Sequence, residues 1–506
     1  MAIVERRKKI LFLPVVRGLY PLALTQSAKT AMRDSAGALG IDGIFPADDR
    51  YSKGVIHGDQ DVRAYWEVWK HDLHDIKALI AFSGDFMSER AIQDTVRLLP
   101  PDVPVFLMVN NDVPGDLTDG KVGDSLCGSL SVHHNLRMLG RRVTRSCRID
   151  MHDRECLTGF LRQYQRIIDG VECLRNMRIA MLGVNPSEFA TTFTNQIKLF
   201  ELGFSLHTYE LITMWGDTML AALADDNAPS YTGPFGTIKF WRPIRKGDPR
   251  VEEAKALLAA AIPALPAPEK IEAIARCFVW IQETFERDGI DAGGIHCWSE
   301  FSRFFGVFPC AFAMLANHAL RRPLVCEADV CHAIMAKLAW AMTGEAGVIL
   351  DINNSGWDPR VFNVFHCSET PPNWLVQPTR VMDNGRIEGH VAPEPFTAIS
   401  AATTGDSFHA IVFQGRMLPQ KPAMRGSSGW AFVPNLPEVI KAIEGAGIHH
   451  YVALKGHLGA EAADALRFRG LAVEDLSQEV PASEAIDAEF AQAGPAMASR
   501  CRVFSA

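Results

Sequence analysis

The order of short apolar runs is the feature that most restricts the fold of this chain. In the first third, continuously apolar runs ending in polar or glycine-containing loops alternate with amphipathic stretches; the runs are residues 9–16, 78–84 and 103–111. Strands buried on both faces are apolar throughout, and strands alternating with helices form a parallel sheet covered on both sides. The sequence therefore predicts a doubly wound α/β domain over residues 1–172.

A second pattern of alternating strands and helices begins in the middle of the chain. The segment "RIAMLGVNPSEF" (178–189) is an apolar run that leads into a polar loop, and another β-prone run follows at "FSLHTYEL". After Pro268, apolar residues recur at helical spacing until Gly289, which is typical of a helix that ends at a glycine. We predict a second doubly wound α/β domain over residues 173–355.

Beyond about residue 355 the pattern changes. The segments "VFNVFHC", "FHAIVFQGRML" and "GWAFVP" are short, β-rich and separated by turn residues. Such a pattern is typical of an antiparallel sheet or barrel. The predicted fold class is therefore two doubly wound α/β domains followed by a β-rich, barrel-like domain over residues 356–506.

Composition excludes several classes of function. The 506 residues are 48% hydrophobic and 22% charged, as in folded multidomain proteins, and the net charge of −8 disfavours nucleic acid as a partner. No run of 18 apolar residues occurs, so we expect no membrane span. The eleven cysteines include no C-x-x-C pair, which favours reduced thiols in the cytoplasm over disulfides or a zinc module. Glycine-rich phosphate loops and the G-x-S-x-G motif are absent, which removes the usual grounds for a nucleotide-binding protein or a serine hydrolase.

Three polar points interrupt apolar surroundings. Glu300 lies in "GGIHCWSEF", Glu327 and Asp329 follow an apolar run in "VCEADV", and His450 begins a β-prone run in "GIHHYVALKGH". If that run is a strand, His450 faces one side and His449 the other. Carboxylates with one imidazole suit a divalent ion such as Mn²⁺ and leave positions open for substrate hydroxyls.

Each of these residues also has a structural interpretation. Asp329 is suitably placed to cap the helix that follows it. Glu327 is close in sequence to Arg321 and Arg322, with which it could form a surface ion pair. Glu300 can be a solvated residue at a helix start. A single strand histidine such as His450 is more often a hydrogen-bonded structural residue than a ligand. Spacing alone leaves both interpretations open.

Several segments resemble the L-fucose/L-arabinose isomerase family. They are "DSLCGSLSVHHNLRMLG", "CWSEF", "VCEADVCHAIM", "LDINN", "FHCSETPP" and "HHYVALKGHLGAEAADALRFRGLAV". The resemblance implies a Mn²⁺-dependent enzyme that interconverts an aldose and a ketose through a metal-chelated enediol. It implies Glu300, Asp329 and His450 as metal ligands, with Glu300 and Asp329 also acting as the catalytic carboxylates. Glu327 is the alternative to Asp329 as the second carboxylate ligand.

The expected substrate contacts are Glu327, Trp298, His366 and Asn353, with Trp298 offering an apolar platform for a sugar face. The resemblance also implies a hexamer with active sites between subunits. Asn353 and Asn354 stand where arabinose isomerases would carry a second histidine ligand, which argues against L-arabinose isomerase itself. Two alternatives stay open: a lyase or transaldolase acting on a modified sugar, and a non-catalytic sugar-binding protein.

Overall fold

A computed structural model describes residues 7–490 except 112–123, 145, 152, 235, 299, 404, 406 and 423, and it leaves the side chains of Glu300 and Gln377 undescribed. The chain divides into two compact units. The first comprises Met1–Glu172 with Arg467–Arg469, and the second comprises Cys173–Leu466 with Gly470–Ala506. No helix within these described segments is both long enough and apolar enough to cross a membrane.

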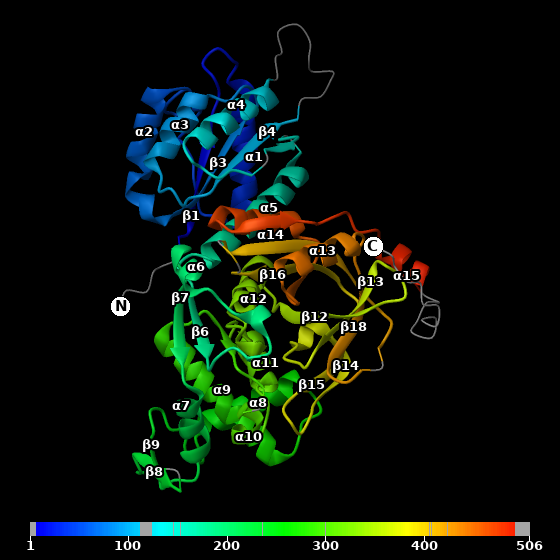
Figure 1. Ribbon diagram of the computed structural model, residues 1–506. Helices are drawn as coiled ribbons and strands as arrows, with labels where there is room; N and C mark the ends of the chain where they lie inside the picture. Colours follow the sequence, from blue (N-terminus) through cyan, green and yellow to red (C-terminus); the bar gives the residue numbers. More distant parts are fainter. Residues whose placement is uncertain are drawn as a thin grey trace. The chain divides into compact units, whose positions relative to one another are not determined.

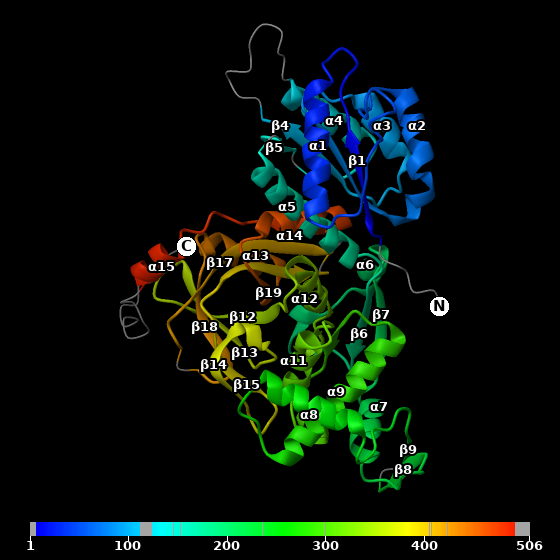
Figure 2. The same ribbon diagram turned by 180° about the vertical axis from the view of Figure 1, so that it is seen from behind.

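The first unit is a five-stranded parallel sheet of order β2-β1-β3-β4-β5 with helices on both faces (Figures 1 and 2). One face packs against α2, α3 and α4, and α1 crosses the other. This arrangement confirms the doubly wound fold predicted for this part of the chain. The elements are β1 (Lys9–Pro14), α1 (Ala23–Ala38), β2 (Gly43–Ile44), α2 (Asp59–Trp69), η1 (Lys70–Asp75), β3 (Ile76–Ser83), α3 (Glu89–Leu98), β4 (Val105–Asn110), α4 (Ser125–Met138), β5 (Cys147–Ile149) and α5 (Arg154–Cys173).

The second unit begins with a four-stranded parallel sheet of order β11-β10-β6-β7. Its longest helix, α9, starts with a proline in its first turn and ends at Gly289, whose φ of 64° is left-handed, as the sequence predicts. The elements of this part are β6 (Arg178–Leu182), η3 (Ala190–Thr192), α6 (Gln196–Glu201), β7 (Ser205–Tyr209), α7 (Leu211–Trp215), η4 (Gly216–Leu220), β8 (Ser230–Gly233), β9 (Gly236–Lys239), α8 (Pro249–Ala261), α9 (Pro268–Asp288), β10 (Ala292–Ile295), α10 (Glu300–Phe305), α11 (Cys310–His318), β11 (Leu324–Val325), η5 (Cys326–Ala328) and α12 (Val330–Thr343).

The rest of the second unit is a nine-stranded sheet that closes on itself. Six strands in the order β18-β13-β12-β19-β16-β17 form an antiparallel barrel, because β17 also pairs with β18. The predicted barrel-like fold is therefore confirmed. The elements are β12 (Val348–Ser355), β13 (Val361–His366), η6 (Pro372–Trp374), β14 (Leu375–Val381), β15 (Ile387–Val391), β16 (Pro395–Ala402), β17 (His409–Leu418), β18 (Ser427–Phe432), α13 (Leu436–Ala446), β19 (His450–Lys455), α14 (Gly459–Arg469), β20 (Ala472–Asp475) and α15 (Ser483–Phe490).

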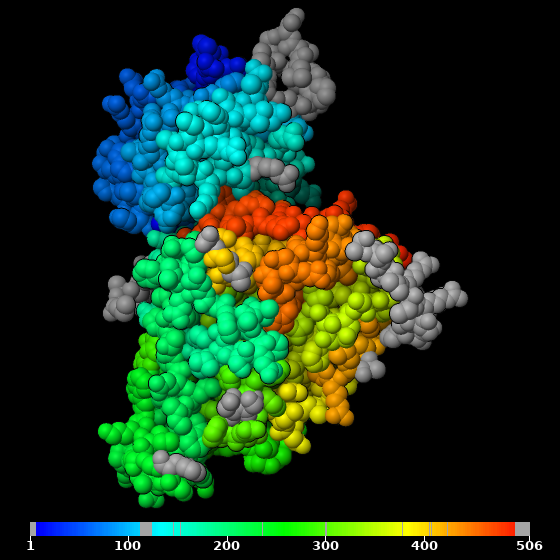
Figure 3. Space-filling view, in the orientation of Figure 1, coloured from blue at the N-terminus to red at the C-terminus, as the bar shows by residue number. Residues whose placement is uncertain are grey.

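The helix α12 joins the parallel sheet to the barrel. Along β19, Tyr451 and Ala453 point into the barrel core, whereas Val452 and Leu454 point outward and pack on α12. The same core includes Ile179 of β6, so one apolar layer connects the two sheets. In Figure 3, the green segments of the parallel-sheet part and the yellow and orange segments of the barrel pack directly against each other. The predicted boundary at residue 355 stays a prediction, and the barrel's first strand, β12, precedes it.

Candidate active site

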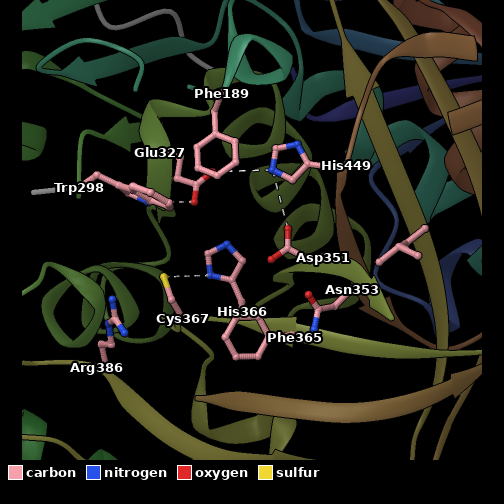
Figure 4. A pocket seen from close by; sticks show the side chains of 11 residues that line it. Phe189, Trp298, Glu327, Asp351, Asn353, Phe365, His366, Cys367, Arg386 and His449 are labelled. Atoms are coloured by element: carbon pink, nitrogen blue, oxygen red, sulfur yellow. Dashed lines mark hydrogen bonds and ion pairs between the residues drawn. The ribbon is translucent and has the colours of Figure 1, made fainter. Parts of the chain in front are cut away.

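A cavity of about 350 Å³ lies where the carboxyl ends of the parallel strands meet the outer wall of the barrel (Figure 4). Loops at the carboxyl ends of parallel strands are the usual ligand-binding region of α/β sheets. The residues that line the cavity come from both parts of the second unit. They are Phe189, Trp298, Glu327, Asp351, Ile352, Asn353, Phe365, His366, Cys367, Arg386 and His449.

Glu327 lies in a strained turn directly after β11. Its φ is 61° and that of Ala328 is 52°, a left-handed conformation that non-glycine residues rarely adopt. The side-chain amide of Asn185 donates to the carbonyl of Ala328 at 3.1 Å. Gly294 of β10 leaves room for the turn, since a Cβ there would lie 2.6 Å from the carbonyl carbon of Ala328. Backbone strain of this kind concentrates at functional sites, where the surrounding structure holds it in place.

The carboxylate of Glu327 is buried and only partly hydrogen-bonded. Trp298 donates its indole N–H to Oε1 at 3.2 Å, and Oε2 lies 3.5 Å from Nε2 of His450. Burial alone would raise the pKa of Glu327, but the imidazoles of His449, His450 and His366 outweigh it and lower that pKa. Glu327 is therefore poised as an ionised carboxylate at the wall of the cavity.

Asp351 and His450 lie side by side on the outer face of the barrel. They are directly paired residues of β12 and β19, and strand alternation turns both side chains away from the barrel core, on the side opposite to Tyr451. The Oδ1 atom of Asp351 lies 3.4 Å from Nε2 of His450. The strand pairing thus brings a carboxylate and an imidazole to the same edge of the cavity.

Asp329 lies behind this group. Its Oδ2 accepts hydrogen bonds from Nδ1 of His332 at 2.7 Å and from Nδ1 of His450 at 2.8 Å. Its Oδ1 accepts from the backbone N–H of His332 at 3.1 Å, so Asp329 caps α12, as its structural interpretation proposed. Burial would raise the pKa of Asp329, but His332 and His450 lower it well below its usual range. Nδ1 of His450 is thus occupied by Asp329, and Nε2 lies toward the carboxylates of Glu327 and Asp351.

Of the four remaining residues predicted from the sequence, the structure describes the side chains of three. Trp298, His366 and Asn353 all line the cavity. His366 ends β13, and its ring centre lies 5.5 Å from that of His450. Asn353 donates to Oδ1 of Asn363 at 3.0 Å. Glu300 is the first residue of α10, but its side chain lies outside the described part of the structure, so its predicted role stays a prediction.

Sequence reasoning missed several residues that line the cavity, among them Asp351, His449, Phe189 and Arg386. His449 was expected to point away from His450, but it precedes β19, so strand alternation does not apply to it. Its ring stacks on Phe189 with centres 5.3 Å apart. Its Nε2 lies 3.8 Å from the carboxylate of Glu327 and 3.9 Å from that of Asp351. Both histidines of the pair therefore face the site.

The fold and the cavity define an α/β protein with a small-molecule pocket whose carboxylates and imidazoles form donor groups suited to a cation. Residues 12–175 match the family model of the fucose/sulfoquinovose isomerase N-terminal domain. This match supports the fucose isomerase-like family predicted from the sequence, a family of sugar-isomerase type, over the part of the chain that it covers. No curated protein matches the chain. The match covers the first unit, whereas the cavity lies in the second.

Proposed function

We propose that this protein is a metal-dependent aldose–ketose isomerase in which Glu327, Asp351 and His450 hold a divalent ion of the Mn²⁺ class. One observation carries this proposal. Among the described residues, Oε2 of Glu327, Oδ1 of Asp351 and Nε2 of His450 are buried yet make no hydrogen bond. Buried polar atoms are nearly always paired, and an unpaired set needs an explanation. Two carboxylate oxygens and one imidazole nitrogen are a suitable donor set for Mn²⁺.

The spacing of these atoms supports the assignment. Two atoms that each lie about 2.2 Å from a shared ion, at right angles, stand about 3.1 Å apart. The observed separations from Nε2 of His450 are 3.4 Å to Asp351 and 3.5 Å to Glu327. Asp329 would then orient His450 through Nδ1, as carboxylates behind metal-binding histidines commonly do. The proposal thus assigns the two carboxylate ligands to Glu327 and Asp351, and a positioning role to Asp329.

The chemistry follows from the groups that face the cavity. A bound divalent ion would polarise the carbonyl and the adjacent hydroxyl of an open-chain sugar. Glu327 is ionised, and besides binding the ion its carboxylate can accept a proton from the carbon beside the carbonyl. Asp351 belongs to a different element and can move the hydroxyl proton. Return of the proton to the neighbouring carbon completes the exchange of aldose and ketose through an enediol.

The walls of the cavity suit an open-chain sugar. Phe189, Phe365 and Trp298 provide apolar faces, while Asn353 and Arg386 offer hydrogen-bond donors. Trp298 also holds Oε1 of Glu327, which leaves Oε2 directed at His450. The hexamer with shared sites and the cytoplasmic location remain predictions.

The test combines metal binding with product analysis. Chelator-treated protein should convert no aldose to ketose, and Mn²⁺ should restore turnover of at least one sugar in a panel of aldoses. Asp351→Asn should abolish tight Mn²⁺ binding. The control is Asp358→Asn, because Asp358 pairs with Arg360 and does not line the cavity. Turnover by metal-free protein, or unchanged Mn²⁺ affinity in Asp351→Asn, would contradict the proposal.

A further inference from the structure

Four cysteines gather beside the cavity from four separate segments. Cys297 follows β10, Cys310 begins α11, Cys326 follows β11, and Cys367 follows β13. All four are free thiols; Cys367 is half-buried and the others are buried. A smaller cavity of about 140 Å³ is lined by three of them together with Trp298, Phe308 and Arg386. Cys367 also lines the larger cavity, so the two spaces adjoin at this thiol.

The sulfur atoms are close enough to share an ion. The Sγ atoms of Cys310, Cys326 and Cys367 all lie within 4.8 Å of one another, and the thiol of Cys326 also contacts that of Cys297. In a tetrahedral zinc site with Zn–S bonds of about 2.3 Å, neighbouring sulfurs stand about 3.8 Å apart. The cluster thus needs to contract by no more than about 1 Å to reach that spacing.

Electropositive groups lie beside the sulfur atoms. Cys310 occupies the first position of α11, where the unpaired N–H groups of the helix carry partial positive charge. The guanidinium of Arg386 lines the small cavity, and its buried Nε makes no hydrogen bond within the described structure. Nδ1 of His366 lies 3.9 Å from Sγ of Cys367. Positive groups therefore face the cluster from three different elements.

We propose that Cys310, Cys326 and Cys367 bind a thiophilic ion of the zinc class, with Cys297 as the fourth ligand. The donor set is all sulfur, so this site is distinct from the oxygen and nitrogen site proposed for Mn²⁺ and does not depend on it.

The chain positions of the ligands indicate what this ion does. Cys297 precedes Trp298, Cys326 precedes Glu327, and Cys367 follows His366, so three ligands are each next to a residue that lines the larger cavity. An ion at the thiols would fasten these segments together. It would also hold the strained turn of Glu327 from its N-terminal side. The ion is therefore structural and positions the residues of the neighbouring pocket.

Cobalt provides a direct test, because thiolate ligation gives Co²⁺ a charge-transfer absorption that oxygen and nitrogen ligands do not produce. The full-length protein is reduced, stripped of metal and titrated with Co²⁺ without oxygen. We expect this band to saturate at a single equivalent and to disappear when Zn²⁺ is added. His450→Ala should keep the band, which separates this site from the Mn²⁺ site.

Two variants and a control complete the experiment. Cys310→Ser and Cys367→Ser should each weaken Co²⁺ binding at least about tenfold and reduce the band. The control is Cys277→Ser, because Cys277 in α9 is buried like Cys310 but lies outside the cluster. The absence of a band in the unmodified protein overturns the proposal, as does an unchanged band in both cluster variants. If the unreduced protein contains a disulfide within the cluster and the reduced protein gives no Co²⁺ band, the cysteines form a redox pair and the proposal is overturned.

Discussion

Replacing Gly294 by alanine tests whether the close approach of β10 positions Glu327. A Cβ at this residue would lie 2.6 Å from the carbonyl carbon of Ala328, whereas ordinary contacts begin at 3.4 Å. The obstructing atom is backbone, so no side-chain rotation relieves the contact. The turn that carries Glu327 must therefore retreat by about 0.8 Å, the difference between these distances.

The size of the effect follows from this displacement. Overpacking a tight site typically costs about 1–3 kcal/mol of the free energy of unfolding. A displacement of about 1 Å in a catalytic group lowers turnover about a hundredfold. For Gly294→Ala we expect Mn²⁺ affinity to fall about tenfold or more, and turnover to fall by a factor approaching a hundred, because Oε2 of Glu327 moves away from His450.

The control for Gly294→Ala is the same substitution at Gly293, the preceding residue of β10. At Gly293, an added Cβ would meet Ala180 at 3.0 Å and Phe285 at 3.1 Å, on the side away from the Glu327 turn. Gly293→Ala should thus have a lower free energy of unfolding, measured with urea. Its affinity for Mn²⁺, measured by calorimetry, should be unchanged. If Gly294→Ala binds Mn²⁺ as tightly as the unmodified protein, the reasoning that β10 positions Glu327 is refuted.

Three further predictions concern single side chains. Trp298→Phe removes the hydrogen-bond donor to Oε1 of Glu327. It should weaken Mn²⁺ binding about tenfold, because hydrogen bonds to charged groups contribute about 1.5–3 kcal/mol. Calorimetry on both proteins at the same pH would measure the change in affinity. Asp329→Asn removes the carboxylate that orients His450 and should lower Mn²⁺ affinity about 10- to 100-fold, and unchanged affinity would mean that His450 is held by other contacts. Burial raises the pKa of Asp217, although the side chain of Trp280 and the backbone N–H of Trp241 donate hydrogen bonds to its carboxylate. At a pH between the two pKa values, the folded protein therefore retains a proton that the unfolded chain has lost. Stability due to this group falls as pH rises from the usual carboxyl pKa of 3.8 to the raised pKa of the folded protein. The urea midpoint of Asp217→Asn should therefore rise relative to that of the unmodified protein as pH increases above about 4.

The fold was predictable because its signals are local. Continuous apolar runs identified the parallel strands, helical spacing up to Gly289 identified α9, and short β-rich runs after residue 355 identified the barrel. Each pattern spans only one element and reflects which of its faces are buried. Barrel closure through β17 and β18 depends on pairing between strands, which no single run encodes.

The site was harder to predict because its geometry depends on contacts between distant segments. In a regular strand, residues two apart face the same side, so the sequence does not distinguish Glu327 from Asp329 as a ligand. The left-handed turn at Glu327 and Ala328 separates them, directing Glu327 to the cavity and Asp329 behind His450. Asp351 lies in the segment "LDINN", but its role was not predicted, because only the pairing of β12 with β19 brings it opposite His450.

The pairing of Asp351 with His450 has a consequence for ion size. These two donors are attached to neighbouring strands of a closed barrel, whose ladder of hydrogen bonds fixes the distance between them. Glu327 belongs to a strained turn outside that ladder. In the proposed metal site, a larger or smaller ionic radius would then be accommodated almost entirely by movement of Glu327. Preference among Mg²⁺, Mn²⁺ and Ca²⁺ would thereby be set by the residues that restrain the turn, Asn185 and Gly294, rather than by the barrel.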